Sequence, residues 1–144
     1  MDSKLLNRSP KTFALVFHTG EEVVAGLTAF AKLNALKASQ LTAIGAFEEL
    51  NVGFFSLDRK EYNKILIREQ VEVLSLLGDI ALKDGEPKLH AHVVIGKADA
   101  TAHGGHLLRG VVRPTLEVVL VESPAYLCRT PDPATGLALI NLER

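Results

Sequence analysis

Four of the five histidines in this 144-residue chain lie between residues 90 and 106, far more than an even spread would place there. They are His90, His92, His103 and His106. The neutral imidazole ring is the side chain that most often binds transition metals in proteins. The clustering makes a metal site the first hypothesis about this chain.

His90 and His92 lie in the run Leu89–Ile95, whose pattern is typical of a β-strand. Successive side chains of a strand point to opposite faces, so both imidazoles project from one face. His106 follows Gly104–Gly105, where glycine permits backbone paths that can aim a side chain from a turn. Three neutral imidazoles that leave a coordination position open are typical of an exchangeable or catalytic zinc site. Nickel, copper and iron accept the same ligands, so the sequence does not separate them from zinc.

A simpler interpretation is that these histidines are exposed residues of strands and turns, or hydrogen-bonded residues at an oligomer interface. The combination of His-x-His with Gly-Gly-His favours the metal site over that interpretation. His103 is a candidate fourth ligand, although its place before the glycines gives it a different direction. His18 is far away in the sequence, and we interpret it as a loop or helix-start residue.

Carboxylates are expected near a metal site of this kind, because a metal-bound water needs a proton acceptor and a metal-bound imidazole needs a partner that orients it. Glu117 is the candidate base, since a carboxylate inside the apolar run Thr115–Val119 is normally paired or close to an edge. Glu69 and Glu72 are weaker candidates. Cys128 has no catalytic motif around it, and we interpret it as a small buried apolar residue.

The charge balance argues against one class of partner. The chain has 16 Lys and Arg against 17 Asp and Glu, a formal net charge of −1, whereas nucleic-acid-binding domains usually have a strong basic excess. A single cysteine excludes an internal disulfide framework, and no glycine-rich phosphate-binding motif occurs. Because the sequence contains neither a signal peptide nor an apolar run long enough to span a membrane, we expect a soluble, cytoplasmic protein without a membrane partner.

The apolar pattern predicts one strand, one helix and then a series of strands. Phe13–Phe17 forms the first strand, and the helix runs from about Glu21 to Ala38, with Thr19 and Glu22 as a capping box. Asp84-Gly85 predicts the tight turn of a hairpin, because both residues tolerate positive φ. The later strands are expected at Leu41–Phe47, Leu50–Leu57, Tyr62–Arg68, Val71–Ile80, Leu89–Ile95, Leu107–Val112, Leu116–Val121 and Leu137–Leu142, with an extended segment over Ser123–Pro133.

One helix followed by many strands indicates an α+β domain, a mostly antiparallel β-sheet packed on that helix. We expect residues 1–144 to form a single domain, because a chain of this length buries roughly two thirds of its unfolded surface without needing a disulfide or metal. Several strands, such as Val118–Val121, are apolar on both faces, and one helix cannot cover both. We therefore expect a homo-oligomer that covers the second face. The alternative is a closed barrel that buries its own interior.

The order of these segments resembles the PPC domain, the plants and prokaryotes conserved domain, also called domain of unknown function 296. The resemblance covers nearly the whole chain, and His-x-His followed by Gly-Gly-His-Leu is its most specific part. The matching segments are Thr19–Glu22, Ala43–Phe47, Glu72–Ala81, Asp84–His92, Gly104–Leu107 and Pro114–Val118.

The resemblance implies a mainly antiparallel domain that assembles as a homotrimer and holds a divalent ion, often zinc. Carried over by position, the metal ligands are His90, His92 and His106. In plants the domain follows an AT-hook, an Arg-Gly-Arg-Pro element that enters the DNA minor groove. Here Arg109–Pro114 contains two intervening valines and is interpreted as a strand end, so this chain resembles the bacterial single-domain type. The resemblance implies the fold, the trimer and the metal more strongly than it implies DNA binding.

Three functions follow as hypotheses. The first is a trimeric metal-binding protein with a DNA-associated or regulatory role. The second is a metal-dependent hydrolase or lyase, in which the open metal position activates water and Glu117 acts as the base. The third is a small-molecule-binding or assembly module without catalysis.

Overall fold

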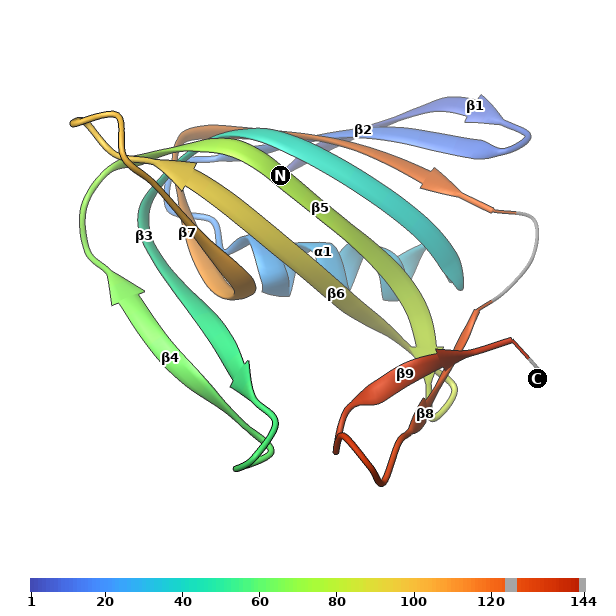
Figure 1. The fold of residues 1–144 in the computed structure, drawn as a ribbon. Helices are drawn as coiled ribbons and strands as arrows, with labels where there is room; N and C mark the ends of the chain where they lie inside the picture. The colour runs from blue at the N-terminus through green and yellow to red at the C-terminus, as the bar shows by residue number, and fades with distance from the viewer. Residues whose placement is uncertain (124–126, 143–144) are drawn as a thin grey trace.

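The computed structural model describes residues 1–123 and 127–142, apart from the side chains of residues 3 and 5–8. A long curved sheet lies over a single helix (Figure 1). The elements are β1 (Asp2–Arg8), β2 (Lys11–His18), α1 (Val23–Leu33), β3 (Ala38–Ser56), β4 (Glu61–Ile67), β5 (Val71–Lys83), β6 (Glu86–Gly96), β7 (Ala102–Glu122), β8 (Cys128–Pro131) and β9 (Ala138–Asn141). The predicted antiparallel sheet with one helix is confirmed.

The strands pair in the order β1-β2-β7-β3-β5-β8-β9, with β4 on β3 and β6 on both β5 and β7. Every pair is antiparallel except β5 with β8. Strands β3, β5, β6 and β7 form a closed ring of pairings, because β6 joins β5 on one side and β7 on the other. The ring has the closure that the barrel alternative anticipated, although β1, β2, β8 and β9 extend beyond it.

The core lies between α1 and the facing side of the sheet. Helix residues three or four apart share one face, and Val23, Leu27 and Phe30 are buried at this spacing. They pack in one cluster with alternate residues of the strands, such as Leu116 and Val118 of β7. Within the described residues, no helix is long and apolar enough to cross a membrane.

The helix ends earlier than predicted. It stops at Leu33 rather than near Ala38, because Asn34 caps it and Ala35 takes a positive φ of 50°. Leu36 is fully buried, so its apolar character reflects packing after the helix rather than helical periodicity.

The predicted capping box is also wrong. The N-cap is Glu22, whose carboxylate accepts hydrogen bonds from the backbone N–H groups of Val24 and Ala25. Thr19 lies before the helix, and its hydroxyl donates to the carbonyl oxygen of Pro114 instead. A carboxylate on the first-turn N–H groups is favourable for the same reasons as a Ser or Thr cap.

Two predicted pairs of strands are single long strands. β3 continues through Glu48 and Glu49, and β7 continues through Pro114, with shifts of register at these places. The breaks that we predicted between these strands are therefore β-bulges, which bend a strand without ending it. The Asp84-Gly85 turn is confirmed, since φ is 53° at Asp84 and 82° at Gly85.

The two ends of the chain also differ from expectation. β1 was not predicted, and it pairs with β2. The expected extended segment Ser123–Pro133 falls partly on residues 124–126, which lie outside the described residues, and its later part forms β8. The predicted last strand is observed as β9, which pairs with β8 as a hairpin.

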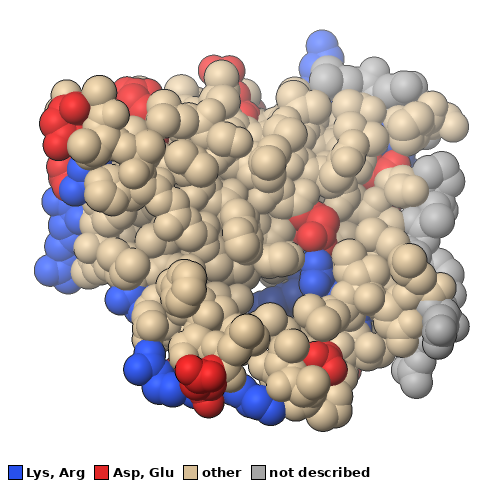
Figure 2. Space-filling model, viewed as in Figure 1, with Lys and Arg blue, Asp and Glu red and all other residues tan. Residues whose placement is uncertain are grey.

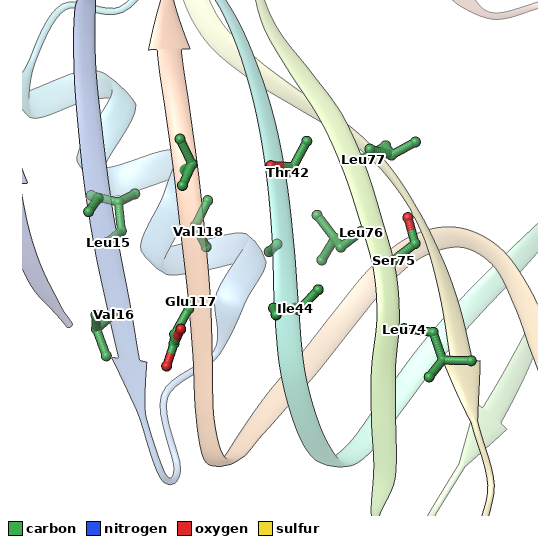
Figure 3. Close-up of a pocket in the computed structure, with 13 residues that line it drawn as sticks. Leu15, Val16, Thr42, Ile44, Leu74, Ser75, Leu76, Leu77, Glu117 and Val118 are labelled. Atoms are coloured by element: carbon green, nitrogen blue, oxygen red, sulfur yellow. The ribbon is translucent and has the colours of Figure 1, made fainter. Parts of the chain in front are cut away.

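The sheet face turned away from α1 carries exposed apolar side chains. Ile44 is 61% exposed, Leu77 58% and Leu74 54%, although all three lie in central strands. They line a shallow pocket together with Glu117 (Figure 3). The core of one chain leaves this face uncovered.

Candidate metal centre

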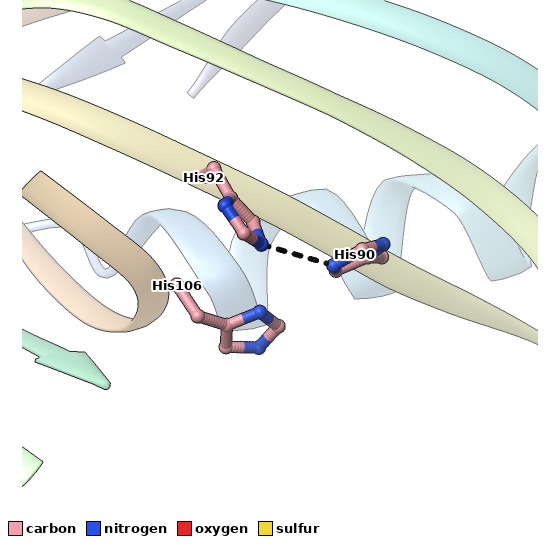
Figure 4. A group of neighbouring side chains, drawn as sticks. All are labelled: His90, His92 and His106. Carbon is pink, nitrogen blue, oxygen red and sulfur yellow. Dashed lines mark hydrogen bonds between the residues drawn. The ribbon is translucent and has the colours of Figure 1, made fainter. Parts of the chain in front are cut away.

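The structure brings three of the four clustered histidines together. His90 and His92 project from β6, and His106 lies directly opposite His92 in the β6–β7 pairing (Figure 4). The intervening Ala91 and Val93 are buried in the core, which confirms the predicted alternation. Local strand geometry thus positions two imidazoles, and the strand pairing adds the third.

The three imidazoles have the spacing of a metal site. One nitrogen from each ring lies within 4.8 Å of the others. The Nε2 atoms of His90 and His92 are 3.2 Å apart. Two nitrogens on one tetrahedral zinc lie about 3.3 Å apart, given bond lengths near 2.0–2.1 Å. The described residues therefore place three imidazole donors in one group, and two of them have the separation that a single zinc ion would require.

The glycines before His106 act differently from the prediction. Neither Gly104 nor Gly105 has a positive φ, and both belong to β7 itself. A Cβ at Gly104 would lie 2.6 Å from the carbonyl oxygen of Val93, which is closer than real Cβ atoms approach. Glycine is needed because β6 and β7 run so close together here, and this close pairing sets His106 beside His92.

His90 is held by a charged pair that the sequence did not reveal. Asp79 of β5 lies opposite it in the sheet, with an Oδ2 to Nδ1 distance of 3.5 Å. Nη2 of Arg129 donates to Asp79 Oδ1 at 2.5 Å and lies 3.3 Å from Nδ1 of His90. Burial alone would raise the pKa of Asp79, but hydrogen bonds to His90 and Arg129 lower it below its usual value. Asp79 is thus a carboxylate anion that orients His90, which is a common arrangement at metal-binding histidines.

His106 and His92 are neutral at pH 7. Burial is the largest cause that lowers the pKa of His106, to about 4, and the neighbouring His90, His92 and Lys88 lower it further. Burial and then the charge of His90 lower the pKa of His92. A neutral imidazole has a free lone pair, which is the form that binds metals.

One nitrogen of His106 has no partner from the described chain. Its Nδ1 is buried and makes no hydrogen bond, while its ring stacks on Tyr62 of β4 with centroids 4.7 Å apart. A buried polar atom without a partner costs free energy unless something else satisfies it. The orphaned nitrogen and the set of three imidazole donors both fit a bound transition metal.

A pocket of about 340 Å³ opens beside the three histidines. It lies between the β3–β4 hairpin and the β8–β9 hairpin, and Figure 2 shows Lys and Arg atoms in the hollow between these two parts. Its lining residues are Val24, Tyr62, Lys83, Lys88, Leu89, His90, Ala91, His106, Leu107, Leu108, Arg129, Leu137, Ala138 and Leu139. A small molecule bound there would touch His90 and His106.

The predicted base is not part of this group. Glu117 lies on β7 in the pocket of Figure 3, and none of the three histidines lines that pocket. Glu72 lies near it in a further shallow pocket, and Glu69 pairs with Lys97 at 2.6 Å. Among the described residues of one chain, the carboxylate that reaches the histidines is Asp79.

The remaining residues singled out from the sequence lie elsewhere. His103 is exposed near the start of β7, where its Nε2 is 3.3 Å from the hydroxyl of Thr101. His18 interacts with Asp2 at 2.7 Å between their side chains. Cys128 is a free, half-buried cysteine in β8. None of the three belongs to the histidine group found in the described residues.

The family model of the Plants and Prokaryotes Conserved (PCC) domain matches residues 7–124. The chain belongs to this family. The three histidines that converge, His90, His92 and His106, lie within the matched PCC region, as does Asp79. Arg129 and the β8–β9 hairpin lie beyond it, so one wall of the pocket is formed outside the matched segment. A search of curated proteins gives no match.

Solved structures of similar proteins agree with the PCC assignment. A plant- and prokaryote-conserved protein from Pyrococcus horikoshii is 32% identical, with a TM-score of 0.86, 97% of this chain covered and 94% of that one. A protein from Archaeoglobus fulgidus described as metal-containing is 31% identical, with a TM-score of 0.85 and coverage of 97% and 96%. A Bacteroides thetaiotaomicron protein provisionally named DNA-binding is 29% identical, with a TM-score of 0.92 and 99% of both chains covered.

Proposed function

We propose that His90, His92 and His106 hold a divalent metal ion, with zinc as the first candidate, and that the protein is a metal-dependent hydrolase or lyase for a small molecule. The observation that carries this proposal is the convergence of three imidazole nitrogens within 4.8 Å at the edge of a pocket. Three protein nitrogens leave at least one coordination position for a ligand, as in catalytic zinc sites. The similar protein from Archaeoglobus fulgidus, described as metal-containing, supports the metal.

The chain's own residues have distinct roles in this proposal. When bound, the ion supplies a Lewis acid that polarises a ligand oxygen and lowers the pKa of a water. Asp79 orients His90, and its ion pair with Arg129 keeps it in the charged carboxylate form. Asp79 is therefore a positioning residue rather than a base. Burial raises the pKa of Tyr62, which therefore keeps its phenolic proton at neutral pH. Glu117 remains the predicted base only if another copy of the chain brings it to the site.

Elemental analysis of the purified protein tests the metal. The wild type should retain about one divalent ion per chain, and His90→Ala and His106→Ala should each lose it, because two donors hold a divalent ion far more weakly than three. His103→Ala is the matched control, since this exposed histidine lies on β7 outside the group. Unchanged metal content in His90→Ala and His106→Ala would contradict the site.

We also propose that the protein forms a homotrimer through the apolar face that one chain leaves uncovered. The exposure of Ile44, Leu74 and Leu77 supports this, because contiguous apolar patches normally mark interaction surfaces. Light scattering should give three times the chain mass of 15.6 kDa. Ile44→Glu should dissociate the assembly, whereas Leu33→Glu, at an exposed position on α1, should not. A monomeric wild type would exclude this proposal.

A DNA-associated role is a second candidate, favoured by the similar structures that are provisionally named DNA-binding proteins. The net charge of −1 opposes it, since phosphate contacts require an excess of Lys and Arg. The decisive measurement is the affinity of this chain, which has no AT-hook sequence, for duplex DNA as the salt concentration increases. A steep fall with salt would support DNA binding, and no binding even at low salt would exclude it.

A further inference from the structure

We propose that the pocket beside the three histidines binds a small organic anion with a short apolar body. This inference rests on the proposed metal site and specifies the class of molecule that the site accepts. Three cationic side chains, Lys83, Lys88 and Arg129, line the pocket, and none of its described lining residues is Asp or Glu. A pocket with this lining favours a negatively charged ligand.

Among the described residues, the two lysines have no anionic partner. Neither Lys83 nor Lys88 forms an ion pair with any described residue. Lys83 is only half-exposed at the end of β5, and Lys88 lies on β6 two residues before His90, on the same face. Ammonium groups beside a concave site are not neutralised as they are in surface ion pairs, so they attract an anion. The metal charge would add to this attraction.

Arg129 gives independent support for an anionic ligand. Its side chain is more than nine-tenths buried and lines the pocket. Its two Nη atoms bind Asp79 and the carbonyl oxygen of Ala138, but its Nε is buried with no hydrogen-bond partner in the described chain. A buried guanidinium donor without an acceptor is costly, and a bound carboxylate or phosphate oxygen would satisfy it.

The rest of the pocket is apolar. The side chains of Leu89, Leu107, Leu137 and Leu139 line it together with the ring of Tyr62. A volume of about 340 Å³ is at the small end of ligand sites, so the body of the ligand is short. The cationic side chains and the apolar wall together select against neutral alcohols, which lack the charge, and against polyanions, which lack the apolar part.

Isothermal titration calorimetry with three probes of equal chain length tests the charge requirement. Hexanoate carries a carboxylate, hexyl phosphate carries a phosphate, and 1-hexanol is the neutral control. We expect at least one anion to bind the zinc-loaded protein about tenfold or more tightly than hexanol. The two anions distinguish a carboxylate site from a phosphate site. Equal affinities for all three probes, or no binding of either anion, would overturn the proposal.

The same titration in variants tests the residues. The double variant Lys83→Gln/Lys88→Gln should bind the preferred anion about tenfold more weakly, and Lys11→Gln, at an exposed position on β2 outside the pocket, should not. Unchanged affinity in the double variant would refute the assignment to these lysines. Metal content is measured in every sample. A wild type that holds metal but binds neither anion contradicts only this inference, whereas a wild type without metal contradicts the proposed function.

Discussion

The low pKa of His106 predicts a specific loss of stability in acid. The folded protein holds this pKa near 4, mainly because burial disfavours the charged ring, whereas an unfolded chain has a value near 6.5. Between these pH values the unfolded chain binds a proton that the folded chain does not, so the free energy of unfolding falls as the pH falls. The stabilisation is complete above pH 6.5 and is lost by about pH 4.

The size of the effect follows from the difference in pKa. A change of 6.5 − 4 = 2.5 units corresponds to about 3.4 kcal/mol at 1.36 kcal/mol per unit. The ring is only half-buried and water screens its neighbours, so we discount this to about 2 kcal/mol.

Urea denaturation of the metal-free protein, followed by circular dichroism at pH 7 and pH 4, measures this loss. The comparison is with His106→Gln, because the glutamine amide is similar in size to the imidazole and does not gain a proton in this pH range. The wild type should lose about 2 kcal/mol more than the variant between the two pH values, at one fixed chain concentration. Equal losses would refute the reasoning, because other titrating groups are common to both proteins and cancel.

Three further predictions concern stability at neutral pH. Gly45→Ala should lower the free energy of unfolding, measured by urea denaturation, by several kcal/mol, because φ is 150° and a Cβ would collide with the carbonyl oxygen of Thr115. Gly85→Ala should lower it by about 1 kcal/mol, because no atom lies near the added Cβ. Similar losses in the two variants would contradict this prediction. Glu22→Ala should lower the free energy of unfolding by about 1–2 kcal/mol through loss of the helix cap, and Glu22→Gln by less. EDTA should lower the Tm of the wild type but not that of His90→Ala, and an unchanged wild-type Tm would argue against a stabilising metal.

The part of the site that was predictable is local. His90 and His92 alternate with buried apolar residues, and this pattern of two is visible in the sequence because a strand fixes which face each residue occupies. His106 was singled out by its place after Gly104–Gly105, and the family resemblance implied it as well. The pairing of β6 with β7 explains why it lies beside His92, and no local pattern in the sequence gives that register.

The unpredictable part depends on partners distant in sequence. Asp79 and Arg129 are 11 and 39 residues from His90, and they reach it through strand pairing and through the β8–β9 hairpin. Pro114 and the charged residues of β3 resemble loop signals, because a bulge and a loop use the same residue types. The helix end was misplaced for a related reason, since buried Leu36 continues the apolar pattern after the helix has stopped.

Net charge proved a poor guide to the local field around the histidines. A chain with a net charge of −1 has no general attraction for a long polyanion such as DNA. Yet the pocket gathers Lys83, Lys88 and Arg129, while Asp79, the carboxylate that contacts His90, is already paired with Arg129. Because positive charge is concentrated in a site of about 340 Å³ rather than spread over a surface, the molecule suits one small anion better than a phosphate backbone. The proposed function and the proposed ligand together give a reason why a fold that needs no metal to form its core would keep one, because the ion and the cations would act on the same ligand.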